Sequence, residues 1–77
     1  MDIQLADVTL HIDEALSKER RADVEVSLRG IDGVVSVNNP DKTPHLTIVE
    51  YNPEKTNSHS ILDCVKGQGV HAELIGF

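Results

Sequence analysis

Short hydrophobic stretches with two different periods follow each other along the chain. Between Val8 and Ile12, apolar residues alternate with polar ones, which predicts a half-buried strand. Val24, Leu28 and Ile31 then recur at positions i, i+4 and i+7, which predicts a helix with one apolar face. The first half of the chain is therefore expected to form a strand followed by an amphipathic helix.

Residues with turn and capping chemistry mark the two ends of this helix. Ser17 is a good N-cap residue, and Glu19 in the first turn suits the positive end of the helix dipole. Gly30 and Gly33 bracket the helix end and the entry to the next strand. The helix is therefore expected to begin after Ser17 and to end near Gly30.

The second half of the chain repeats this succession with one extra strand. Its expected elements are a short strand at 34–37, a proline-containing turn at 38–44, a third strand at 45–51, a helix capped by Thr56 or Asn57, and a last strand at 70–75. The pattern does not show which side chains of the third strand face the core. Leu46 and Ile48 favour one face, whereas Val49 and Tyr51 favour the other.

The order β-α-β-β-α-β is typical of an α+β domain of the ferredoxin-like class. Such a fold has a four-stranded antiparallel sheet with two helices on one face, and 77 residues form a single domain, 1–77. The short turn at 38–44 predicts that the second and third strands are antiparallel. The helical crossovers favour a parallel pairing of the first strand with the third on a right-handed path.

The chain is acidic and almost free of aromatic residues, with a formal net charge of −6, one Tyr and one Phe. Both features argue against nucleic-acid binding, which requires a basic surface and stacking rings. No run of residues approaches the roughly 20 apolar positions of a membrane-spanning helix. The acidic surface suits a protein that stays monomeric or that meets a basic partner.

The cysteine content and the N-terminus favour a cytoplasmic location. Cys64 is the single cysteine, so the chain has no internal disulfide, and a lone thiol fits a reducing compartment. The N-terminus has Asp2 and Asp7 where a signal peptide needs a basic start and an apolar run. Cys64 also shares the apolar face of the second helix with Ile61 and Val65, and is expected to be a small core residue.

A set of positions spread over nearly the whole chain has a characteristic joint spacing. It consists of Val24, Glu25, Leu28, Gly33, Val34 and Val37, the segment Val49-Glu50-Tyr51-Asn52-Pro53, and Thr56, Ile61, Val65, Gly69, Val70, Ala72 and Leu74. This spacing resembles that of the heavy-metal-associated domain of copper and mercury chaperones and of metal-transporting ATPases. The resemblance implies the same ferredoxin-like fold and a place in or near metal handling.

The chain departs from that family at the metal site itself. Counted back from Gly33, the family's Met-x-Cys-x-x-Cys motif would occupy residues 15–20. Ala15 stands at the methionine, and Ser17 and Arg20 stand at the two cysteines. Two thiolates at this spacing hold a soft ion such as Cu(I), whereas a hydroxyl and a guanidinium do not. The resemblance therefore implies the fold and not a Cu(I) site.

The basic residues around the start of the first helix form the first candidate site. Ser17, Lys18, Arg20 and Arg21 lie at a helix N-terminus, where free N–H groups favour anions. The functional hypothesis is contact with a carboxylate, a phosphate or a partner protein through loop 13–20. The alternative is an ordinary solvated helix end, because neighbouring acidic residues cancel much of the charge.

His11 and His71 form the second candidate site, for a metal ion. If the first and last strands pair antiparallel, both imidazoles point to the open face of the sheet, where cross-strand neighbours lie about 5 Å apart at Cβ. Two imidazoles could share Zn²⁺, Ni²⁺ or Cu²⁺, and Glu73 lies on the same face. The alternative is two exposed histidines without a metal, since structural zinc usually has four ligands.

The sequence favours a binding function over catalysis. It has no nucleophile with an adjacent base, no phosphate-binding glycine loop and no paired-carboxylate signature, so no enzyme is expected. The leading hypothesis is a protein-interaction or regulatory module in or near metal handling, with loop 13–20 as the contact surface. The second hypothesis is metal-ion binding or transport through His11 and His71 in place of thiolates.

Overall fold

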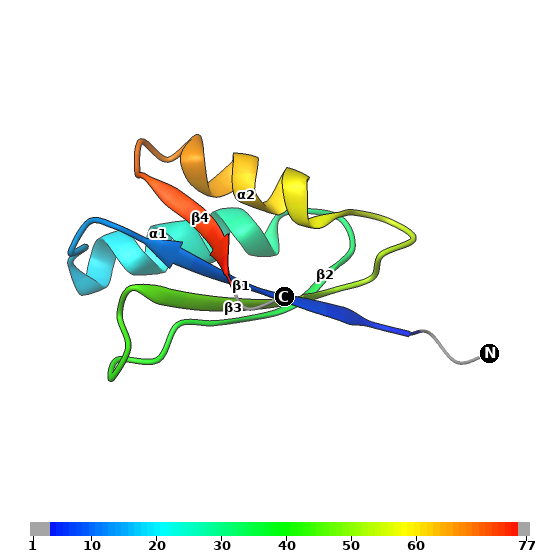
Figure 1. Cartoon of the computed structure of the whole chain (residues 1–77), viewed down its shortest axis with the longest axis horizontal. Coiled ribbons are helices and arrows are strands. Elements are labelled where there is room, and N and C mark those ends of the chain that lie inside the picture. The colour runs from blue at the N-terminus through cyan, green and yellow to red at the C-terminus, as the bar shows by residue number, and fades with distance from the viewer. Residues whose placement is uncertain (1–3, 76–77) are drawn as a thin grey trace.

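The computed structural model of the protein describes residues 4–75 and has the predicted order of strands and helices (Figure 1). The elements are β1 (Ala6–Ile12), α1 (Lys18–Arg29), β2 (Val34–Asn38), β3 (Leu46–Tyr51), α2 (Ser58–Lys66) and β4 (Ala72–Ile75). The first residues of the N-terminal segment, including Asp2, and the aromatic Phe77 lie outside the described residues. Within residues 4–75, no helix has the length and apolar character needed to cross a membrane.

The four strands form one sheet in the order β2-β3-β1-β4, and each neighbouring pair is antiparallel. The predicted antiparallel pairing of β2 with β3 is confirmed. The expected parallel pairing of β1 with β3 is wrong. A helical crossover returns the chain parallel to the strand that it left, but the returning strand is β2, which lies two positions away from β1 and leaves room for one strand between them. The β2–β3 turn then reverses the chain, so β3 enters the space between β1 and β2 antiparallel to both.

Both helices cover the same side of the sheet, and the core lies between the two layers (Figure 1). The buried core residues are Val8, Leu10 and Ile12 of β1, Val24 and Leu28 of α1, Val37 of β2, Val49 of β3, Ile61 and Val65 of α2, and Val70 before β4. The predicted inward faces of β1 and α1 are therefore confirmed. The other side of the sheet is covered by neither helix, so its side chains point outward.

Burial settles which side chains of β3 face the core. Thr47 and Val49 are buried. Successive residues of a strand point to opposite faces, so Leu46 and Ile48 lie on the side that the helices leave uncovered. The register agrees with this, because Ile48 lies opposite the outward-facing Thr9 of β1.

Each helix begins at a side chain that bonds a free backbone N–H group. The Ser17 hydroxyl accepts a hydrogen bond from the Arg20 N–H at 3.1 Å, as predicted for the cap of α1. Asn57 caps α2 by accepting from the Ser60 N–H at 2.8 Å, whereas Thr56, the alternative cap, is buried. These caps satisfy donors that have no partner within a helix.

Candidate functional site

The polar side chains of the loop from β1 to α1 bind the loop to the rest of the fold. Ser17 is occupied as the cap of α1. The Arg20 guanidinium donates to the backbone carbonyl of Gln68 and, at 3.2 Å, to the Gln68 side-chain oxygen. The Gln68 amide in turn donates to the Ser27 hydroxyl at 3.0 Å. Arg20 therefore ties the start of α1 to the connection between α2 and β4.

Arg21 contacts a different part of the molecule from Arg20. Its guanidinium donates to the Asn39 side chain at 2.9 Å and to Asp41 at 3.3 Å, and both partners belong to the β2–β3 connection. A surface pocket of about 170 Å³ lies beside this contact and is lined by Lys18, Arg21, Ala22, Glu25, Asn39 and Asp41. Its two basic and two acidic side chains balance each other in charge.

The structure thus does not bring the guanidinium groups of Arg20 and Arg21 together on one surface. Arg20 and Arg21 both donate hydrogen bonds within the chain. Arg20 reaches the α2–β4 connection, and Arg21 reaches the β2–β3 connection. Ser17 uses its hydroxyl for the helix start. Contact of Ser17, Lys18, Arg20 and Arg21 with a partner or an anion stays a prediction.

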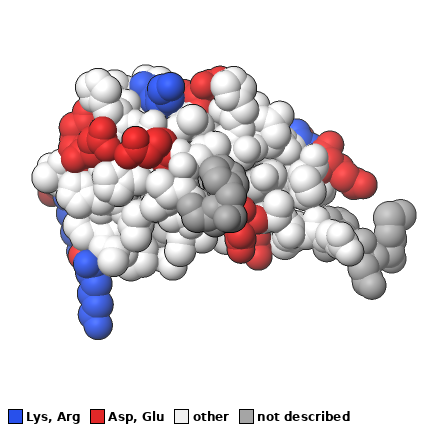
Figure 2. Space-filling view, in the orientation of Figure 1, with Lys and Arg blue, Asp and Glu red and all other residues white. Residues whose placement is uncertain are grey.

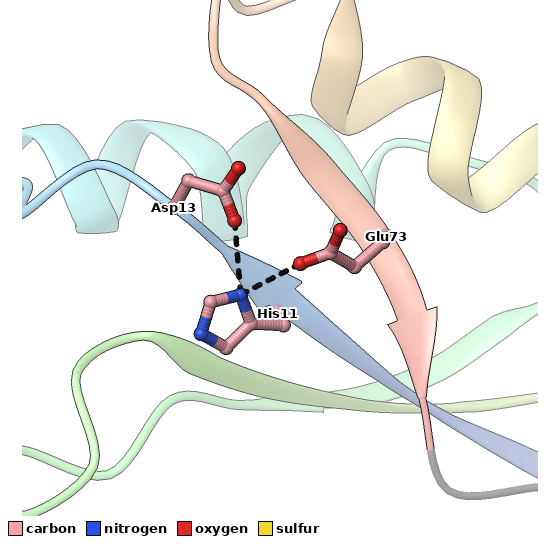
Figure 3. Close-up of side chains that lie close together, drawn as sticks. All are labelled: His11, Asp13 and Glu73. Atoms are coloured by element: carbon pink, nitrogen blue, oxygen red, sulfur yellow. Dashed lines mark hydrogen bonds and ion pairs between the residues drawn. The ribbon is translucent and has the colours of Figure 1, made fainter.

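Three side chains with metal-ligand chemistry meet at the end of β1 (Figure 3). The Nδ1 atom of His11 lies 3.1 Å from Oδ1 of Asp13 and 3.0 Å from Oε1 of Glu73. One ligand atom from each side chain lies within 4.8 Å of the other two. Figure 3 shows both carboxylates turned toward the same nitrogen of the ring. We call these three residues the β1-end cluster.

Strand geometry brings the β1-end cluster together. Glu73 is directly opposite His11 in the antiparallel β1–β4 ladder, and directly opposite residues point to the same face. Asp13 follows His11 by two residues, so it stays on the same side of the extended chain. The side chains of His11, Asp13 and Glu73 are 37, 54 and 58% exposed, respectively. The cluster is therefore open to solvent.

The charges of the β1-end cluster are unbalanced. A ring nitrogen carries at most one hydrogen, yet two carboxylates approach the same Nδ1 atom of His11. Even a protonated imidazole supplies one positive charge against two negative ones. Among the described residues, His11 is the ion-pair partner of both Asp13 and Glu73. An added cation would therefore be favoured at this position.

A second imidazole lies beside the cluster. The ring of His45 stacks on that of His11, with centroids 5.7 Å apart and planes inclined by 15°. The Nδ1 atom of His45 lies 2.7 Å from the carbonyl oxygen of Ile12, which can only accept a hydrogen bond, so Nδ1 carries the hydrogen. A neutral His45 then keeps its lone pair on Nε2. Sequence reasoning missed this contact, because His45 meets β1 only through the pairing of β1 with β3.

His71 does not join His11, and the expected cross-strand pair of these two histidines is wrong. Glu73 lies opposite His11, and His71 precedes β4, where its carbonyl accepts from the Asp13 N–H at 2.9 Å. The His71 imidazole instead contacts Glu14 at 2.8 Å, and the His71 backbone N–H donates to the same carboxylate. The alternation of side chains along a strand predicts the face on which a residue lies. It does not predict whether the pairing of two strands is shifted by two residues, because such a shift keeps every side chain on the same face.

The contact between His71 and Glu14 shifts both pKa values. The hydrogen bond to Glu14 raises the pKa of His71 above its ordinary 6.5. The hydrogen bond from His71 lowers the pKa of Glu14 below its ordinary 4.5. The His71 contribution to stability is complete below pH 6.5 and is lost as the pH rises through its folded-state pKa. The Glu14 contribution is complete above pH 4.5 and is lost as the pH falls through its folded-state pKa.

Glu14→Gln is expected to move the pKa of His71 down toward 6.5, because it removes the hydrogen-bonded charge that holds the proton on the ring. An NMR titration of the His71 ring protons measures this. Glu54→Gln removes a carboxylate elsewhere on the surface and is expected to leave the His71 titration unchanged. A His71 pKa that is the same in the natural chain and in Glu14→Gln would contradict the contact.

The single cysteine is not part of the β1–α1 loop. Cys64 is in α2, packs against the hydrophobic core as expected, and is half-buried. Burial raises the pKa of its thiol, so the thiolate form that binds soft metals is disfavoured.

No protein-family model and no curated protein sequence matches the chain. Solved structures match over nearly its whole length. The N-terminal domain of a potential copper-translocating P-type ATPase from Bacillus subtilis, in the Cu(I)-loaded state, has a TM-score of 0.83 and 20% identity, covering 92% of this chain and 88% of that one. Oxidised MerP from Ralstonia metallidurans has a TM-score of 0.82 and 17% identity, covering 92% and 97%.

The CopZ metallochaperone is similar as well, with a TM-score of 0.77 and 21% identity over 91% of this chain and 100% of that one. At these identities the likeness shows the fold. The chain therefore has the ferredoxin-like fold of heavy-metal-associated domains, as the resemblance of its sequence implied. Its Ser17 and Arg20 stand where that resemblance would place thiols.

Proposed function

We propose that this domain binds a borderline divalent cation, such as Zn²⁺, Ni²⁺ or Cu²⁺, at the β1-end cluster. The observation that carries the proposal is the convergence of one imidazole and two carboxylates from β1 and β4 within 4.8 Å. The likeness to domains described as copper-binding or as metallochaperones supports a role in metal handling. The site differs from the predicted one, because Asp13 and Glu73 replace His71 beside His11.

The spacing of the ligand atoms fits such an ion. Metal–ligand bonds of about 2.0–2.2 Å in a tetrahedral arrangement place the ligand atoms about 3.3 Å apart. The His11 nitrogen is 3.0 and 3.1 Å from the two carboxylate oxygens, so small side-chain rotations suffice to admit the ion. A nitrogen and oxygen ligand set suits borderline divalent ions and disfavours Cu(I), which prefers thiolates.

Three protein ligands leave at least one coordination position open. A closed structural zinc site has four protein ligands, whereas an open site can exchange its ion with water or with a group from another molecule. The exposure of all three side chains is consistent with such exchange. We therefore propose a carrier or sensor role for the site rather than a structural one. The expected cytoplasmic, non-enzymatic character of the domain fits this role and stays a prediction.

Titration of the isotope-labelled chain with Zn²⁺, Ni²⁺ and Cu²⁺ is expected to perturb the NMR signals of His11, Asp13 and Glu73. His11→Ala is expected to abolish binding, because it removes a ligand, and Glu73→Gln to weaken it about tenfold, because it replaces a charged carboxylate with a neutral amide. Binding should also weaken at low pH, since protons compete for the same atoms.

His59→Ala provides the matched control. His59 is an exposed histidine 3.4 Å from Asp63 on α2, so it offers similar ligands outside the β1-end cluster. This variant is expected to keep the full affinity, and so is His71→Ala. The proposal is overturned if His59→Ala loses as much affinity as His11→Ala, or if the His11 signals do not respond to millimolar metal.

A further inference from the structure

The side of the sheet that the helices leave uncovered has an ordered surface pattern, which we call the open face. Its residues on β1, β3 and β4 are Asp7, Thr9, His11, Leu46, Ile48, Glu50, Glu73 and Ile75. The register arranges them in rows across the strands. The middle row is Ile48, Thr9 and Ile75, and its two isoleucines are 41% and 37% exposed. A mainly apolar row, with two isoleucines on either side of Thr9, therefore crosses the centre of this face.

Acidic residues flank the apolar row on both sides. Glu50 and Asp7 lie directly opposite each other in one neighbouring row, and Glu73 lies beside His11 in the other. Like charges directly opposite each other destabilise a sheet. The Ser36 hydroxyl donates to Glu50 at 3.4 Å but brings no charge. Positive charge supplied from outside the chain would relieve the repulsion between Asp7 and Glu50.

The basic residues of the chain lie away from the open face. None of the four strands contains Lys or Arg. The seven basic residues are in the helices and connections, at Lys18, Arg20, Arg21, Arg29, Lys42, Lys55 and Lys66. Figure 2 shows acidic side chains gathered over the end of β1 and the start of β4, with Lys and Arg side chains toward the edges of the view. Two copies of this chain meeting at their open faces would place like charges together.

We propose that the open face docks a basic amphipathic helix of another protein, lying along β1. Residues two apart on a strand are separated by about 6.6 Å, so the two acidic rows lie about 13 Å apart. A helix rises about 1.5 Å per residue, so basic residues eight positions apart span about 12 Å. In such a helix, apolar residues three and four positions after the first basic residue lie about halfway along this span. They would therefore contact the middle row of the open face. The partner helix thus carries Lys or Arg at both ends of a two-turn apolar stripe.

The test uses a synthetic helical peptide of this pattern and the isotope-labelled full chain in the presence of a chelator. We expect NMR shifts centred on Thr9, Ile48 and Ile75, and an affinity that falls as salt is added. The double variant Asp7→Asn, Glu50→Gln is expected to bind about fivefold more weakly, the effect of losing two exposed ion pairs. Asp7 and Glu50 take no part in the proposed cation site, so the outcome is independent of metal binding.

The double variant Glu19→Gln, Glu54→Gln is the matched control, since it removes the same charge from outside the open face. It is expected to bind the peptide as the natural chain does. The proposal is overturned if this control weakens peptide binding as much as the Asp7→Asn, Glu50→Gln variant does. It is also overturned if the NMR shifts are confined to the helices, or if a peptide with Glu at the basic positions binds equally well. Concentration-dependent dimerisation through the open face, seen by sedimentation and abolished by the peptide, also overturns it, because the occupant is then a second copy.

Discussion

A variant that carries both Ser17→Cys and Arg20→Cys is expected to bind Cu(I) tightly at the start of α1, where the natural chain has no thiol. Ser17 caps the helix and its hydroxyl lies 3.1 Å from the Arg20 backbone nitrogen, so the two positions are neighbours in space. Thiols at a helix N-terminus have lowered pKa values, because the helix dipole stabilises thiolates. Two adjacent thiolates select soft ions such as Cu(I).

The same variant is expected to be less stable without metal. Loss of the serine cap costs about 1 kcal/mol, and loss of the charged hydrogen bonds from Arg20 to Gln68 costs about 2 kcal/mol. Cu(I) should restore this loss, since a metal that binds only the folded state stabilises it. Transfer of Cu(I) from a coloured chelator measures the binding, and urea unfolding with and without Cu(I) measures the stability.

The pair Ser17→Ala, Arg20→Ala separates the thiols from the structural loss. It loses the same contacts and gains no ligand, so it should be destabilised similarly and should not respond to Cu(I). Each single cysteine variant should bind Cu(I) far more weakly than the double variant. Comparable Cu(I) binding by the natural chain, through Cys64, would contradict the expectation.

The sequence predicts those features of the fold that depend on local periodicity. The alternation from Val8 to Ile12 fixes which face of β1 is buried, and the spacing of Val24 and Leu28 fixes the buried face of α1. Ser17 is identified as a cap from its side-chain chemistry alone. These features need no knowledge of distant segments, because a residue's face follows from its position within its own element.

Strand neighbours are harder to predict, because they depend on connections between elements. The β-α-β-β-α-β order gives the fold class, but the position of β3 between β1 and β2 follows only when the crossover and the turn are combined. The β1-end cluster shows the same difficulty on a finer scale. The strand expected at 70–75 places His71 and Glu73 on one face, and only the register shows that Glu73 meets His11.

The basic residues in the first turn of α1 show a third limit of sequence reasoning. Arg20 and Arg21 are adjacent in the chain, yet successive side chains on a helix point about 100° apart. Each therefore reaches a different neighbouring segment, Arg20 toward Gln68 and Arg21 toward Asn39. Clustering in sequence predicts a charged surface only when the side chains have no partners in the fold, which requires the tertiary structure.

Ser17 and Arg20 have structural roles in this chain. Ser17 starts the helix, and Arg20 joins it to the α2–β4 connection. Residues able to hold a cation lie close by, at the end of the strand that feeds the same loop. The end of β1 thus offers oxygen and nitrogen atoms with metal-ligand chemistry, whereas the loop that follows it has no thiol.

Gly33→Ala is expected to lower the free energy of unfolding by about 3 kcal/mol, a large part of the roughly 5–15 kcal/mol of a typical domain. Gly33 joins α1 to β2 with a φ of 102°, which L-residues rarely adopt. A Cβ atom there would lie 2.7 Å from the Cβ of Lys55 and 3.2 Å from the Cγ2 of Thr56. Backbone strain and crowding should each cost on the order of 1–3 kcal/mol. Urea unfolding measures the sum.

Gly69→Ala separates these two contributions. Gly69 also has a positive φ, of 84°, but a Cβ atom there would meet no atom within 4 Å apart from those of its neighbours in the chain. Its replacement should therefore cost only the backbone strain, about 1 kcal/mol. The difference between the two variants reports the crowding of Gly33 against the segment that leads into α2. Equal losses in the two variants would show that Lys55 and Thr56 move aside freely, and would contradict a rigid junction at this point.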